Sequence, residues 1–520
     1  MKNLKFLTIL CFTILLIQCQ RSTPTVPKLG STDIKVIGSE EAIPFFKNGY
    51  LLLHSFEYED AAEQFVKAQE IDSNFVMAYW GEAMTKNHPL WKQQFTEKGM
   101  AALKKLADTP EERATKAKTN FEKDMLGAVE ILFAEGEKKE KDQEYKNYME
   151  ELYKKYPKNL EVASFYALSL LGAVKGGRNK EAYEKGAIIA KGVIKENPNH
   201  PGALHYLIHS YDDPDHAKLA LSAANSYSKV APDAAHALHM PSHIYVAMGM
   251  WDEVINSNIA SYKASVTRKE RKDLSNDALG YHSYKWLMYG RLQKGEFNLA
   301  KEQVLEMQKN CEEKPSHKAR NHLIQMKSAY TVESFDWDEE LLADTTEFYD
   351  LNISTRSMQA FVEGFKYYNY KENDKLSSVI EQMESEIIPA ENAMVTGGAK
   401  MCSGITAYQQ PPDKTDVNQA KVMLMELKAL AAALKGDDAK AEKWFNNAVD
   451  LEVSSTFTYG PPEIVKPSPE LYGEWLLEKD RYEEAKHQFE KALERAPERR
   501  LSVMGVQSAE KMFAHNNPKQ

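Results

Sequence analysis

Cysteine is scarce in this chain of 520 residues, which contains Cys11, Cys19, Cys311 and Cys402 and no CxxC spacing. So few cysteines exclude a small scaffold that depends on disulfides. Cys311 and Cys402 are compatible with a disulfide in an oxidising compartment and equally with two isolated thiols.

Glycine and proline are also infrequent, with 25 and 21 residues. A low content of turn-forming residues favours long helices.

Positive charge is not in excess, because the formal net charge is -10. A general nucleic-acid binder needs a basic face that releases counterions, so we expect no nucleic-acid partner. The GxGxxG, Walker, GxSxG and HExxH motifs are absent, and no alternating strand pattern is evident.

The chain has a single long hydrophobic run, at residues 6–17, after a short basic start. This run is shorter than the roughly 20 residues of a membrane span and fits the core of a signal peptide. It ends in Leu-Ile-Gln-Cys at residues 16–19, which resembles the bacterial lipobox. We therefore expect a signal peptide at 1–18, lipidation of Cys19 and a tether over 19–35. The body would then sit in the cell envelope, in the periplasm or at the cell surface, anchored to a membrane by lipid.

Beyond the tether the sequence repeats. The tetratricopeptide (TPR) pattern has a period of 34 residues, with small residues at positions 8, 20 and 27 and an aromatic residue at 24. A unit that begins at Lys466 matches with Gly473, Ala485, Phe489 and Ala492. Units that begin at residues 42 and 422 match similarly, and weaker units begin near residues 201, 235 and 281.

This pattern predicts an all-α fold, a TPR-type solenoid of helical hairpins wound as a right-handed superhelix. We expect an N-terminal TPR-like solenoid over 36–310, divergent helical repeats over 311–415 and C-terminal TPR repeats over 416–515.

Histidine is concentrated in one part of the solenoid. Five of the 14 histidines lie in two short segments, 205–209 and 236–243. Spacings of three and four place side chains on one helix face, where two imidazoles can bind one metal ion. We predict a metal site built from His209, His239 and His243, with His205 or Asp213 as the fourth ligand. Zinc is the first choice, and nickel, copper or iron are alternatives.

Repeat numbering assigns further residues to the concave groove, which TPR proteins line with positions 2, 5, 9, 12 and 13 of the first helix of each unit. The residues expected at this ligand groove are His54, Trp80, His88, His236 and His282. Two other interpretations of the histidines stay open. One is a set of hydrogen-bond donors to a carboxylate or peptide ligand without a metal, and the other is a set of buried structural residues.

Several segments resemble a family of large, mostly uncharacterised bacterial TPR proteins. They are the motifs HYLIH at 205–209 and HMPSHI at 239–244 and the segments 51–56, 77–81, 87–91 and 459–462. The resemblance covers roughly residues 40 to 500 and implies the solenoid fold, but no established activity. Lys285 departs from it, because the family pattern has a further histidine there.

The sequence favours a lipid-anchored scaffold that binds a protein, a peptide or a small ligand in its groove. The alternatives are a metal-dependent hydrolase and a protein that captures or delivers metal. No glutamate lies within the histidine segments, and Asp212 and Asp213 are the only nearby carboxylates that we expect to be able to act as a base. Hydrolysis needs a general base, so the sequence favours a binding protein over an enzyme. It does not exclude an enzyme.

Overall fold

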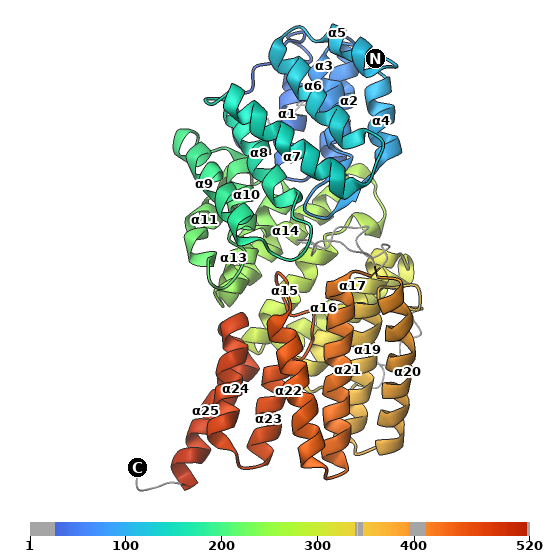
Figure 1. Ribbon diagram of the computed structural model, residues 1–520, viewed down its shortest axis with the longest axis vertical. Helices are drawn as coiled ribbons and strands as arrows, with labels where there is room; N and C mark the ends of the chain where they lie inside the picture. Colours follow the sequence, from blue (N-terminus) through green and yellow to red (C-terminus); the bar gives the residue numbers. More distant parts are fainter. Residues whose placement is uncertain (1–26, 339–340, 342–346, 395–411, 517–520) are drawn as a thin grey trace, which may run out of the picture.

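The computed structural model describes residues 27–338, 341, 347–394 and 412–516. Within these ranges the fold is all-α, a TPR-type solenoid, and the only strands are the two-residue β1 (Asn87–His88) and β2 (Gln93–Gln94). The predicted fold class is therefore confirmed. Figure 1 shows an elongated stack of helices with the N-terminal half at the top and the C-terminal half at the bottom.

The N-terminal half runs from blue to green in Figure 1. Its helices are α1 (Ile43–His54), α2 (Tyr58–Ile71), α3 (Val76–Met84), α4 (Thr96–Lys104), α5 (Pro110–Lys116), α6 (Asn120–Phe133), α7 (Lys138–Lys155), α8 (Leu160–Gly172), α9 (Lys180–Glu196), α10 (Pro201–Ser210), α11 (Leu221–Val230), α12 (Ala235–His239), α13 (Pro241–Ala247) and α14 (Trp251–Lys272), with the short 3-10 turns Ala217–Leu219 and Asn276–Ala278.

The C-terminal half follows from yellow-green to red. Its helices are α15 (Tyr281–Lys294), α16 (Phe297–Glu313), α17 (His317–Ser334), α19 (Ile353–Asn369), α20 (Asn373–Asn392), α21 (Lys414–Leu434), α22 (Asp438–Ser454), α23 (Ser468–Glu478), α24 (Tyr482–Arg495) and α25 (Arg500–Asn516). Consecutive helices pack against each other as hairpins, for example α1 with α2 and α23 with α24.

Close packing within each hairpin follows from the small residues of the repeat. A Cβ atom added to Gly49 would lie 3.1 Å from the Phe65 ring, and one added to Gly473 would lie 3.0 Å from the Phe489 ring. Both aromatic rings are almost fully buried. The small residue at position 8 therefore admits the aromatic residue at position 24, as the sequence pattern predicts.

The helix that carries the HMPSHI motif is broken. Pro241 has no backbone N–H, and α12 ends at His239 while α13 begins at Pro241. The repeat pattern predicts one continuous first helix in this unit. The break divides its histidines between two short helices.

The described part of the predicted tether packs onto the body. Leu29 is 2% exposed, the Lys28 N–H donates to Asp233, and the Ser31 N–H donates to the Asn199 carbonyl. These contacts hold residues 28–31 of the predicted tether against the turns that precede α10 and α12. The predicted signal peptide and Cys19 lie outside the described residues, as does Cys402, whereas Cys311 is buried in α16.

Candidate metal centre

Six histidine side chains from four helices meet near the junction of the two halves of the solenoid. We call this group the histidine cluster. Its members are His205 and His209 on α10, His236 and His239 on α12, His243 on α13, and His282 on α15.

The first triad of the cluster consists of His205, His209 and His236. The Nε2 atom of His205 lies 3.0 Å from Nε2 of His209 and 3.2 Å from Nε2 of His236. The Nδ1 atom of His205 lies 2.8 Å from the His54 carbonyl oxygen, which can only accept, so this Nδ1 carries the proton. The lone pair of His205 Nε2 therefore faces two further imidazole nitrogens.

The second triad consists of His239, His243 and His282, each of which offers a ring nitrogen within 4.8 Å of the others. The Nδ1 atom of His239 lies 2.7 Å from Asn258 Oδ1, and Nδ1 of His243 lies 2.5 Å from Asp212 Oδ2. The Nδ1 contact of His239 leaves its Nε2 available to a ligand. Nε2 of His239 is buried without a hydrogen-bond partner in the described part of the chain.

The two triads are adjacent. The ring centroids of His209 and His243 are 5.6 Å apart, and those of His236 and His239 are 6.1 Å apart. The indole of Trp286 on α15 covers the second triad, with its centroid 4.9 Å from His239 and 4.5 Å from His243. The loop between α22 and α23 supports this ring, because Gly460 packs directly against it.

Burial determines the charge state of the cluster. It lowers the pKa of His205, His209, His236 and His282 well below the usual range, and that of His239 to about 3, and the neighbouring imidazoles add to the shift. These five rings are therefore neutral at neutral pH, which is the form of imidazole that binds a metal ion.

A cavity of about 380 Å³ opens onto the cluster. We call it the histidine cavity. His236, His239 and His282 line it, together with Glu57, Arg268 and a group of aromatic residues. The cluster is thus accessible to a small molecule from one side.

Glu57 is a carboxylate in this cavity that the sequence analysis missed. Its Oε1 accepts a hydrogen bond of 2.8 Å from the backbone N–H of His236, and burial raises its pKa to about 6. The expectation that Asp212 and Asp213 are the only carboxylates nearby is therefore wrong. Glu57 is about 180 residues away in sequence, so only the superhelix brings it here.

Asp213 does not join the histidines predicted to share its metal ion. Its carboxylate pairs with Arg178 at 2.7 Å and with Nδ1 of His216 at 2.7 Å. Asp212, one residue earlier, contacts His243 instead. The turn after α10 therefore aims the two carboxylates at different partners.

Of the five predicted groove residues, three line the histidine cavity and two are buried in the core. His236 and His282 line the histidine cavity as half-buried members of the cluster, and His88 lines it while stacked on Tyr58, with ring centroids 3.9 Å apart. His54 and Trp80 are fully buried and face no groove, because both pack around Phe165, 4.9 and 5.6 Å from its ring centroid.

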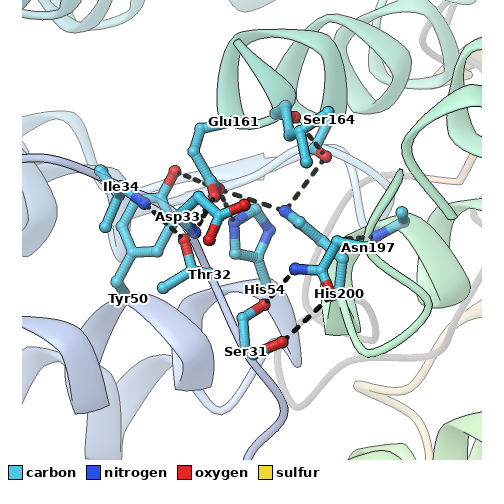
Figure 2. Close-up of polar contacts among 12 residues, drawn as sticks. Ser31, Thr32, Asp33, Ile34, Tyr50, His54, Glu161, Ser164, Asn197 and His200 are labelled. Atoms are coloured by element: carbon cyan, nitrogen blue, oxygen red, sulfur yellow. Dashed lines mark hydrogen bonds and ion pairs between the residues drawn. The ribbon is translucent and has the colours of Figure 1, made fainter. Parts of the chain in front are cut away.

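His54 belongs to a structural network around Glu161 on α8, shown in Figure 2. Glu161 Oε2 accepts from Tyr50 at 2.9 Å and lies 3.4 Å from His54 Nε2 and 3.2 Å from His200 Nε2. Its Oε1 binds the hydroxyl of Thr32 in the N-terminal segment. The network joins α1, α8 and the start of α10 to residues 31–34 and leaves Glu161 without exposure to the cavity.

Comparisons with known proteins give no function. No family model matches the sequence, and no curated protein matches it. Similar solved structures include the P58(IPK) TPR domain (13% identity, covering 92% of this chain and 100% of that chain, TM-score 0.22). They also include yeast Tom70 (12%, 92% and 90%, TM-score 0.34) and Ypp1 (11%, 92% and 86%, TM-score 0.41).

Among the described residues, no helix has both the length and the apolar character that are needed to cross a bilayer.

Proposed function

We propose that this protein binds transition-metal ions, zinc first, in the histidine cluster. The observation that supports this most is the hydrogen bonding of three Nδ1 atoms, in His205, His239 and His243, to a backbone carbonyl, an amide oxygen and a carboxylate. Histidines that ligate a metal almost always use the second ring nitrogen in this way, because the contact fixes the ring and its tautomer.

The distances in the first triad support the same proposal. A zinc–nitrogen bond of about 2.0–2.1 Å in a tetrahedral site places ligand nitrogens about 3.3 Å apart. The Nε2 atoms here are separated by 3.0 and 3.2 Å. Without a cation, the single lone pair of His205 Nε2 would have to serve two imidazoles at once.

Each triad offers three imidazoles, so the cluster has the ligands for two ions with an open coordination position at each. Such open positions are typical of catalytic or transfer sites rather than structural ones. Nickel, copper and iron also accept imidazole ligands and stay alternatives to zinc.

We further propose that the metal centre belongs to a lipid-anchored scaffold outside the cytoplasm. The lipobox at Cys19 supports the anchor, and the curved helical stack supports binding of a protein or peptide partner on its concave face. A protein that captures or delivers metal in the cell envelope fits this combination.

A second candidate is a metal-dependent hydrolase. It is favoured by the histidine cavity, which gives a substrate access to both triads, and by the Glu57 carboxylate beside His236. A zinc ion with an open position acts as a Lewis acid toward a carbonyl or phosphoryl oxygen. Glu57 would hold a proton at its carboxylate during such a reaction.

Elemental analysis of protein purified without chelator tests the proposal. We expect the wild type to retain up to two equivalents of zinc, the His209→Ala variant to lose the ion of the first triad and the His243→Ala variant that of the second. His487→Ala is the matched control, because His487 is exposed on α24, far along the chain from the cluster. Circular dichroism establishes that each variant is folded. A folded wild type that retains no metal in micromolar zinc would refute the proposal.

A further inference from the structure

The histidine cavity has an aromatic wall. Phe56 and Tyr58 stack with ring centroids 5.3 Å apart, and His88 stacks on Tyr58. Trp91 stands edge-on to Tyr58 at 5.3 Å, and Phe95 stands edge-on to His88 at 5.4 Å. All five rings line the cavity, so it offers a planar apolar group a surface on which to stack.

The aromatic wall begins at the first triad. The Phe56 ring centroid lies 4.3 Å from that of His205 and 5.8 Å from that of His236. Trp91 lies 6.5 Å from His236. A ligand that rests on the wall therefore has one end beside the metal ligands.

The other end of the wall carries positive charge. Lys98 Nζ lies 5.3 Å from the Phe95 ring centroid, and the Lys86 carbonyl accepts from the Phe95 N–H at 2.9 Å across the β1–β2 hairpin. Both lysines line the cavity. Within the described part of the chain, neither forms an ion pair.

The remaining cations of the cavity are engaged. Arg268 is neutralised by Asp60, at 2.5 Å, and by Glu59, at 3.0 Å. The ammonium of Lys318 donates to the carbonyls of Asp277 and Leu279, at 2.6 and 2.8 Å. Lys86 and Lys98 are thus the cations that remain for a ligand, and Lys86 is half-buried, where an anion binds it more strongly than in bulk water.

We propose that the histidine cavity binds an aromatic carboxylate, with its ring on the wall formed by Tyr58, Trp91 and Phe95 and its carboxylate on Lys86 and Lys98. The opposite end of the ligand then reaches the first triad. The role of that end as a metal-facing group rests on the proposed function, whereas the ring and carboxylate contacts do not.

Calorimetric titration of the zinc-loaded protein with hippurate and with its neutral amide, hippuramide, tests this inference. The two probes share the ring and differ in the carboxylate. We expect hippurate to bind at least tenfold more tightly. The Lys86→Met variant should lose at least tenfold in affinity for hippurate and none for hippuramide. Lys47→Met, which removes an exposed lysine of α1 outside the cavity, is the matched control and should bind both probes like the wild type.

The outcomes separate this inference from the metal proposal. Equal affinity for the two probes, unchanged hippurate affinity in Lys86→Met, or no binding of either probe to protein with full zinc content would overturn the ligand assignment and leave the metal centre intact. Binding of hippurate by protein that takes up no zinc would support the cavity and refute the centre. A peptide that ends in phenylalanine, with a free or an amidated carboxyl group, shows whether the carboxylate comes from a chain end or from a small free acid.

Discussion

Asp212 Oδ2 lies 2.5 Å from Nδ1 of His243, and both side chains are buried. The carboxylate accepts a hydrogen bond from Nδ1 of His243 and so fixes the orientation of this ring of the second triad. In metal sites, the loss of such an orienting group typically lowers metal affinity about 10- to 100-fold.

The Asp212→Asn variant should therefore bind zinc about 10- to 100-fold more weakly at the second triad and normally at the first. Competition with a chromophoric chelator measures both affinities. Asp108→Asn, at an exposed position, is the control and should be unchanged. Equal affinities in Asp212→Asn and the wild type would mean that the carboxylate does not serve the metal.

The Glu161→Gln variant should be destabilised without any change in zinc content. Glu161 is 2% exposed and connects His54, His200 and Tyr50, so loss of its charge weakens several buried contacts at once. We expect a loss of about 2–3 kcal/mol in the free energy of unfolding by urea. Glu151→Gln removes an exposed pair with Lys154 and should leave the free energy of unfolding close to that of the wild type.

A larger side chain at position 460 should disturb the second triad through Trp286. A Cβ atom added to Gly460 would lie 2.0 Å from the indole, and the backbone there has φ +86. The Gly460→Ala variant should therefore lose stability and second-triad zinc affinity together. Gly436→Ala has a similar φ of +73 with nothing within 4 Å, so it isolates backbone strain from the clash. If both variants lose only stability, Trp286 does not support the metal site.

Sequence periodicity shows which residues share a face of one helix, but not which hairpins come together in space. The sequence therefore predicted only part of the site. The spacing of His205 and His209, and of His239 and His243, placed each pair on one helix turn, and the structure brings His236 and His282 to them. Glu57 and Asn258 were missed, because contacts between residues of different hairpins depend on the superhelical curvature. Repeat numbering also placed His54 in the groove. This was wrong because position in the repeat carries no information about the contact with Glu161 that holds the His54 ring in the core.

Zinc-free protein should lose stability as the pH falls below about 6.5. Burial lowers the pKa of His88 to about 4 and that of His322 to about 3, whereas both have about 6.5 in the unfolded chain. Between these values the unfolded state binds more protons, so each ring contributes a loss of about 1.4 kcal/mol per pH unit as the pH falls. Urea unfolding in the presence of a chelator from pH 7 to pH 4.5 measures this slope, and His88→Gln should reduce it by one proton. An unchanged slope in His88→Gln would show that folding does not lower the pKa of His88.

Crystals grown with zinc and measured on both sides of the zinc absorption edge show directly whether the histidine cluster holds metal. We expect an anomalous peak about 2.0–2.1 Å from the Nε2 atoms of His205, His209 and His236, and a second peak within the other triad. Zinc-containing crystals without a peak at either triad, with the imidazoles bonded only to each other or to water, would contradict this expectation.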